Sequence, residues 1–270
     1  MTFSRPIYRF LLGRHFGVAA ALAAVPALIG AVLGALLNTH LKQRATARTL
    51  IEGLPVFRRL VDDETLDFLS TSGYLGFVFK HPLTFLAFAL AVGAPALTTP
   101  AGDRGRGALD LLLASPVSRR GVVRASAAVT ATCALLAALG PFLGAVVGAL
   151  VSGRWEEAPI GRYAIASANA AAFCLCLGAV ALLLSAGAED GVSAARRFSA
   201  FFLLAMLADA LSLLWDDGAW LRWITPGGYY RASETIAGKA DHALHFGALL
   251  GAALLAWIMA ERVAERRRRA

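Results

Sequence analysis

The sequence predicts an all-α integral membrane protein with six transmembrane helices, and three observations lead to this class. The 270 residues are 58% hydrophobic and only 16% charged, whereas a soluble domain carries about 25% charged residues. The charges are concentrated between uncharged windows of roughly 20 residues, the length that crosses a bilayer. The basic residues lie beside these windows, where anionic lipid head groups favour them. We therefore expect a lipid bilayer around the chain and no nucleic-acid partner.

The first predicted span is Phe16 to Leu37, an uncharged window that is long enough as a helix to cross the hydrocarbon. The third window is longer than one crossing, so we expect tilt, a projecting end or a kink at Gly140-Pro141. Glycine pairs spaced by four, which suit close helix packing, occur at residues 30/34, 144/148 and 247/251. The predicted spans are 16–37, 83–99, 121–151, 163–185, 198–215 and 243–260.

Two further segments are predicted outside the spans. Residues 1–15 suit an interfacial amphipathic helix, because Ile7, Phe10 and Leu11 share one face and Arg5 and Arg9 lie opposite. We expect this helix to lie in the cytoplasmic head-group layer before the chain turns into the membrane. Residues 215–242 are too polar to span, and tryptophans there indicate an outer-face loop or a re-entrant segment.

The distribution of basic residues predicts the orientation. Fifteen of the 26 lysines and arginines fall on the side that carries both termini. On the opposite side, the five basic residues of the first loop are matched by five acidic ones. The positive-inside rule therefore places both termini and residues 100–120 in the cytoplasm, with the chain multi-pass in the plasma (inner) membrane.

Residues 100–120 interrupt the apolar windows with a turn-rich stretch and a short amphipathic one. In ALDLLLA, residues 108–114, three leucines lie on one side of about two helical turns. Pro116 ends this helix, and Ser118 can cap the next one. Arg119 and Arg120 then fall in the first turn of the third span, where the helix dipole disfavours cations. We expect lipid phosphates or an acidic protein partner to compensate them.

The stretch GRGALDLLLASPVSRRGVVRA, residues 105–125, resembles the signature of ABC type-2 transporter permeases, most closely from Leu109 to Arg120. WITPGGYYRASETIAGK (223–239) and AWIMAERVAERRRRA (256–270) are similar to the same family. The resemblance implies a cytoplasmic coupling helix that docks into a separate ATP-binding-cassette ATPase. It also implies pairing with a second permease copy or a paralogous permease, in an exporter rather than an importer. The residues expected to couple are Arg104, Arg106, Leu109, Asp110, Leu112, Leu113, Pro116, Ser118, Arg119 and Arg120.

The chain contains no Gly-x-x-x-x-Gly-Lys-Ser/Thr phosphate loop. We therefore expect no cofactor and no enzymatic activity in this chain, with ATP and Mg on the partner ATPase. The low charge of the spans indicates a hydrophobic or amphiphilic substrate. Asp209 is the one acid well inside a predicted span. It lines the translocation path, or lies near the outer surface if the span ends early.

Two other functions are compatible with parts of the sequence. An ion-driven secondary transporter needs coupling acids or broken spans at matching places in two halves, and no convincing internal repeat is present. An intramembrane hydrolase is suggested by Glu156-Glu157 followed by Arg162. However, His81, His242 and His245 form no metal-ligand spacing. The three cysteines, Cys133, Cys174 and Cys176, are interpreted as buried structural thiols.

Overall fold

The computed structural model describes residues 5–53, 70–107, 118–240 and 242–266. Throughout these ranges the regular structure is helical, which confirms the all-α class. Six segments are long and apolar enough to cross a membrane. They are Arg5–Leu41 within α1 (Arg5–Gly53), Thr71–Gly105, Arg120–Ser152 within α7 (Arg119–Ser152), α8 (Ile160–Ala186), α9 (Gly191–Leu214) and α11 (His242–Arg266). The second of these contains α3 (Thr71–Gly76), η2 (Phe77–Phe79), α4 (Pro82–Leu97), η3 (Thr98–Gly102) and α5 (Asp103–Gly105).

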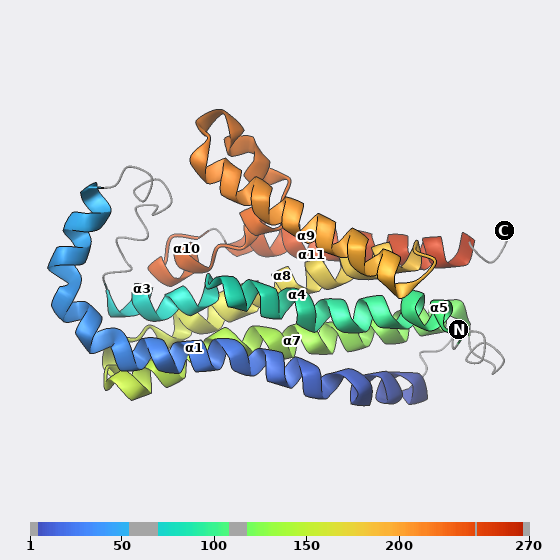
Figure 1. The fold of residues 1–270 in the computed structure, drawn as a ribbon, viewed down its shortest axis with the longest axis horizontal. Helices are drawn as coiled ribbons and strands as arrows, with labels where there is room; N and C mark the ends of the chain where they lie inside the picture. Colours follow the sequence, from blue (N-terminus) through green and yellow to red (C-terminus); the bar gives the residue numbers. More distant parts are fainter. Residues whose placement is uncertain (1–4, 54–69, 108–117, 241, 267–270) are drawn as a thin grey trace.

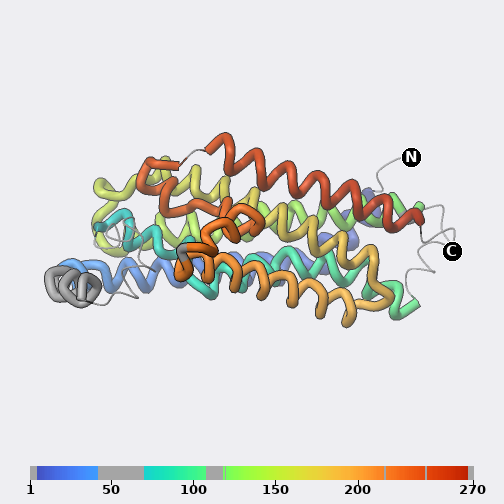
Figure 2. The backbone as a smooth tube through the Cα atoms, turned by 90° about the horizontal axis from the view of Figure 1, so that it is seen from above, coloured from blue at the N-terminus to red at the C-terminus, as the bar shows by residue number. Residues whose placement is uncertain are grey.

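The long helices run side by side in an elongated bundle (Figure 1). The start of α1, α5 and the end of α11 lie at one end, which we call the terminal end; α3 and α10 (Ala232–Ala237) lie toward the opposite, far end. Helix α9 starts at the terminal end (Figures 1 and 2) and diverges from the bundle toward the far end (Figure 1). Leu203, Leu204 and Leu207 of α9 are exposed as a result.

Helices α1 and α7 approach each other through two glycine pairs. Gly30 and Gly34 of α1 lie against Gly144 and Gly148 of α7 so closely that a Cβ on Gly148 would stand 2.6 Å from the Gly30 carbonyl oxygen. This contact confirms two of the three predicted packing pairs. The third pair is different, since Gly247 and Gly251 of α11 face open space in this chain.

The predicted interfacial helix at residues 1–15 is wrong, because α1 is one unbroken helix from Arg5. Its buried positions recur every three or four residues through the predicted turn without a change of phase. They are Ile7, Leu11, His15, Ala19, Ala23, Pro26, Gly30, Gly34 and Leu37. Ile7 and Leu11 pack in one cluster with Val122 and Ala125 of α7. The apolar face that predicted lipid contact is therefore the start of the helix–helix interface.

Helix α7 remains helical through Pro141 over its 34 residues, about 51 Å at the usual rise. The hydrocarbon core of a bilayer is only about 30 Å thick. Of the expected ways to accommodate this length, a tilt or a projecting end fits the continuous helix. Helix α9 begins at Gly191, earlier than the predicted start at Phe198.

The segment between α9 and α11 returns into the bundle. It comprises η5 (Asp216–Trp223), η6 (Gly227–Tyr229) and α10. Tyr230 is buried, its hydroxyl donates to the Phe79 carbonyl oxygen at 2.9 Å, and its ring stacks on Phe173 at 4.9 Å. Phe85 and Phe88 of α4 meet the same ring edge-on. This aromatic cluster packs the returning segment against α4 and the middle of α8.

Candidate functional site

The residues expected to couple to an ATPase surround a gap in the described chain. Arg104 and Arg106 precede residues 108–117, and Ser118 and Arg120 follow them, so these four are described. Arg119 is described as part of α7 without its side chain. The ends of α5 and the start of α7 both lie at the terminal end (Figure 1). Leu109, Asp110, Leu112, Leu113 and Pro116 lie outside the described residues, and so does the predicted coupling helix.

Before the gap, a buried carboxylate connects α5 to α1. Asp103 accepts hydrogen bonds from Arg106 at 2.7 Å and from Arg14 of α1 at 3.3 Å. His15 of α1 is within hydrogen-bond distance of the Thr98 hydroxyl, at 3.1 Å. A buried charge is tolerated when it is paired and hydrogen-bonded. Asp103 therefore holds α5, the helix that precedes residues 108–117, against α1.

Residues 98–105 are helical, although the sequence from residue 100 on is turn-rich. The reason is their contact with the end of α8: the Ala101 N–H donates to the Ser185 hydroxyl at 3.2 Å, and the Arg104 guanidinium donates to the Ala188 carbonyl oxygen. The two hydrogen bonds satisfy the Ala101 N–H and the Ala188 carbonyl oxygen, which would otherwise need water as a partner. Arg104 thereby joins α5 to the connection between α8 and α9.

Small residues bring α5 and η3 against the start of α9. A Cβ on Gly105 would lie 3.0 Å from the Asp190 Cβ, and one on Gly191 would lie 3.1 Å from the Gly102 Cα. Asp190 is the N-cap of α9 and accepts a hydrogen bond from the Ser193 N–H at 2.7 Å. This bond favours the ionised carboxylate and lowers the pKa of Asp190.

After the gap, α7 is joined to α11 by two ion pairs. Ser118 caps α7 as predicted, accepting from the Gly121 N–H at 3.1 Å. Arg120 pairs with Glu265. Arg124 makes a two-pronged contact with Glu261, with Nε–Oε1 at 2.9 Å and Nη2–Oε2 at 3.1 Å. The acidic partner expected for Arg120 therefore belongs to this chain.

Sequence reasoning missed Glu261 and Glu265 as members of this site. A signal was present: Arg120 and Arg124 are four residues apart, and so are the two glutamates. Residues at this spacing share one helix face. Because α7 leaves the terminal end and α11 returns to it, the first arginine meets the last glutamate (Figure 1). The sequence alone does not reveal which antiparallel pair of spans is adjacent.

Asp209 lies away from this cluster, toward the far end of α9. The helix continues to Leu214, so it does not end before Asp209. Its carboxyl carbon would lie 3.0 Å from a Cβ on Gly227, which places Asp209 beside η6. The positive charges of Lys80 and Arg222 act on this carboxylate. The proposed path residue and the coupling residues are thus separated along the bundle.

The acidic pair that suggested a hydrolase takes part in structural contacts. Glu157 binds Arg154 at 2.7 Å and accepts from the Thr71 hydroxyl, and this hydrogen bond lowers the pKa of Glu157. A general acid requires the opposite shift. Arg162 donates to the Ile236 carbonyl oxygen at 3.0 Å. In the described ranges no three His, Cys, Asp or Glu side chains gather as metal ligands.

The three cysteines are buried and free. They lie within α7 and α8, as the interpretation as structural thiols requires.

Compared with models of protein families, with curated proteins and with solved structures, the chain matches none. The residues and their geometry are therefore the basis for assigning a function.

Proposed function

We propose that the chain is the permease subunit of an ATP-binding-cassette exporter, powered by a separate ATPase subunit that binds ATP and Mg. The sequence support is the stretch Gly105 to Ala125, with its leucine-rich run followed by Pro-Val-Ser-Arg. Six apolar helices of spanning length are compatible with this role. The substrate class that fits the low charge of the spans is hydrophobic or amphiphilic.

The observation that carries the proposal is that the described residues on both sides of 108–117 are tied to other spans. On one side, Asp103 joins α5 to α1 and Arg104 joins it to the α8–α9 connection. On the other side, Arg120 and Arg124 join α7 to α11. A force applied to this segment by an ATPase would reach these spans directly. A single exposed ion pair contributes little to stability, but two neighbouring pairs between the same two helices fix how these helices lie against each other.

The exposed apolar faces of the bundle support a partner within the membrane. Leu203, Leu204 and Leu207 on α9 and Leu254 and Leu255 on α11 are exposed in the single chain. In the proposed complex, a second copy or a paralogous permease covers part of these faces, and lipid covers the rest. The terminal end would face the cytoplasm, where the ATPase resides.

The test uses the full chain, tagged and expressed in its own membrane with its native partners. Replacing both leucines, Leu112→Asp with Leu113→Asp, should leave insertion intact but release the ATPase subunit during purification. The loss should appear by mass spectrometry and as loss of ATP hydrolysis in the purified sample. The reason is that charge on the leucine face prevents burial in an apolar groove.

A matched control places the same charge elsewhere at the terminal end. Val192 at the start of α9 is apolar and exposed, and Val192→Asp should retain the ATPase. Retention of the ATPase by the doubly substituted chain, at the level of wild type and the Val192→Asp control, would contradict the proposal. Absence of any ATPase from the wild-type preparation would contradict it as well.

A further inference from the structure

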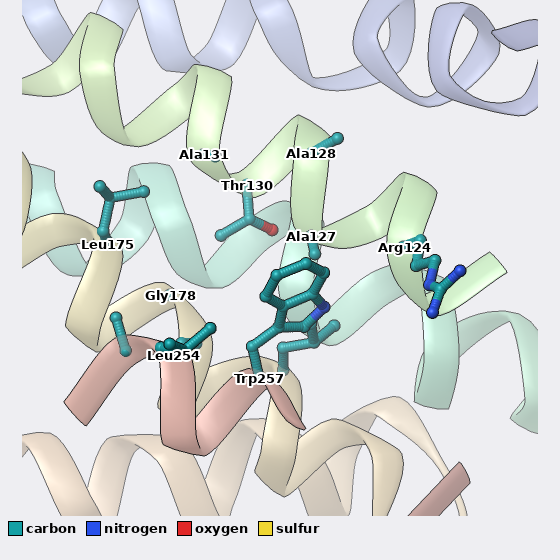
Figure 3. Close-up of a pocket in the computed structure, with 12 residues that line it drawn as sticks. Arg124, Ala127, Ala128, Thr130, Ala131, Leu175, Gly178, Leu254 and Trp257 are labelled. Atoms are coloured by element: carbon teal, nitrogen blue, oxygen red, sulfur yellow. The ribbon is translucent and has the colours of Figure 1, made fainter. Parts of the chain in front are cut away.

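A cavity lies between α7, α8 and α11. It has a volume of about 590 Å³, within the range of roughly 300–1,000 Å³ usual for small-molecule sites. Its walls are mainly small and apolar, and Leu254 and Trp257 of α11 border it while remaining exposed to the surroundings (Figure 3). The lining includes Arg124, Ala127, Thr130, Ala131, Gly178 and Trp257.

Thr130 supplies the one hydroxyl group of this lining. Thr130 is 4% exposed, and its side-chain oxygen has no hydrogen-bond partner among the described residues. Threonines in helices commonly donate to the carbonyl oxygen four residues earlier. Thr132 of the same helix does so, to Ala128 at 3.0 Å. Thr130 instead directs its oxygen toward the side of the cavity that Trp257 borders (Figure 3).

An unsatisfied hydroxyl in an apolar wall is unfavourable, because it loses its bonds to water and gains none. A ligand that places an acceptor oxygen in this cavity would remove that cost. Since the remaining walls are hydrocarbon, the same ligand must present an apolar body. A single acyl chain with an ester, carboxyl or ether oxygen near its head has this chemistry.

A second cavity of about 400 Å³, most of whose lining residues are charged, adjoins the apolar one and shares Arg124 and Trp257 with it. Its lining also contains Arg120, Glu261 and Arg262. With Glu265, which pairs with Arg120, three arginines face two glutamates, and one positive charge is left uncompensated. Arg262 is exposed and has no ion-pair partner in the described part of the chain. This end of the cavity therefore favours an anionic group.

We propose that the two cavities together bind an anionic phospholipid of the surrounding leaflet. One hydrocarbon chain occupies the apolar cavity, the Thr130 hydroxyl donates to an oxygen of the glycerol-ester region, and the head group lies near Arg124 and Arg262. The site requires only that α7, α8 and α11 lie in a bilayer. It does not depend on an ATPase, so it stands or falls separately from the proposed function.

Trp257 provides a local probe of this site. The other four tryptophans lie in η4 and in or beside η5, toward the far end, and are replaced by phenylalanine for the measurement. The purified chain is placed in vesicles of unlabelled phosphatidylcholine that contain a small fraction of phosphatidylglycerol with brominated chains. We expect saturable quenching of Trp257, with roughly five-fold preference over brominated phosphatidylcholine.

Three variants separate the parts of the site. Thr130→Val keeps the shape but removes the hydroxyl, and it should weaken binding roughly two- to ten-fold, whereas Thr132→Val should have no effect. Arg262→Ala should reduce the preference for the anionic lipid, and Arg266→Ala, outside the cavity lining, should not. Ala131→Phe fills the apolar cavity and should abolish the saturable phase.

Several results would overturn the proposal. Equal quenching by the two brominated lipids would mean that Trp257 senses only bulk lipid. An anionic preference that survives Ala131→Phe and Thr130→Val would mean that the head group binds at the surface with no chain in the cavity. Removal of the saturable phase by excess inorganic phosphate would indicate a phosphate site rather than a lipid site.

Discussion

Arg124 and Glu261 form the best-aligned ion pair between two spans, and its contribution is testable at the level of single residues. Glu261 is well shielded, with 15% of its side chain exposed. Either Arg124→Glu or Glu261→Arg places like charges opposite each other and should lower the melting temperature of the purified chain. The exchanged pair, Arg124→Glu with Glu261→Arg, should recover roughly half or more of the loss.

The measurement is a double-mutant cycle of melting temperatures in one detergent at low salt, where screening is small. Arg197→Glu is a suitable control, because Arg197 is an exposed arginine at the same end that contacts a carbonyl oxygen, that of Gly187, rather than a glutamate. Additive losses in the doubly exchanged chain would show that the pair does not couple α7 to α11.

The residues of the candidate site were predictable to the extent that they act locally. Ser118 was predicted as a helix cap because an N-cap bond joins residues three apart. The partners of Arg120 and Arg124 were not predicted, because they lie more than 130 residues away along the chain. Thr130 carries no sequence signal at all, since an unpaired hydroxyl is visible only once its neighbours are placed.

At the level of helices, the glycine contact between α1 and α7 makes a quantitative prediction. Gly148→Leu inserts a side chain where a Cβ alone would approach the Gly30 carbonyl oxygen to 2.6 Å. We expect a loss of about 1–3 kcal/mol of stability or more, typical of overpacking. The measurement is thermal or denaturant unfolding of the purified chain.

Gly251→Leu on α11 is the matched control, because a Cβ there meets nothing within 4 Å. It should leave the stability of the single chain unchanged. If both substitutions cost the same, the close contact of α1 with α7 would be refuted and the effect would reflect leucine insertion in general.

Helix α1 shows why some elements were predicted and others were not. Window hydropathy found its apolar core, because that property depends on composition alone. Of the predicted face, Ile7 and Leu11 are buried but Phe10 is exposed, and the partner of the buried pair was predicted as lipid where the structure has α7. An amphipathic pattern shows that a face is buried without showing what buries it. The buried positions recur every three or four residues without a break from Ile7 to Leu37. This continuity was the signal that distinguished packing against another helix from contact with lipid.

At the scale of the whole molecule, six spans and the common location of the first and last helix ends followed from the sequence. The divergence of α9 did not, because it depends on how α9 packs against α4 and α8 rather than on its own hydrophobicity. Likewise, the return of Tyr230 into the bundle depends on a ring of aromatic partners from two other helices. Pairwise contacts between distant segments are the part that patterns in one sequence leave undetermined.

The orientation of the whole bundle in the membrane can be tested, and every proposal about an ATPase depends on it. The three native cysteines are buried within α7 and α8, so a membrane-impermeant maleimide should not label the unmodified chain in intact cells. Glu156→Cys at the far end should be labelled from outside, because Glu156 is exposed in η4. Ser118→Cys at the terminal end should be labelled only after the membrane is opened. Labelling of Ser118→Cys in intact cells would place residues 108–117 beyond the reach of any cytoplasmic ATPase.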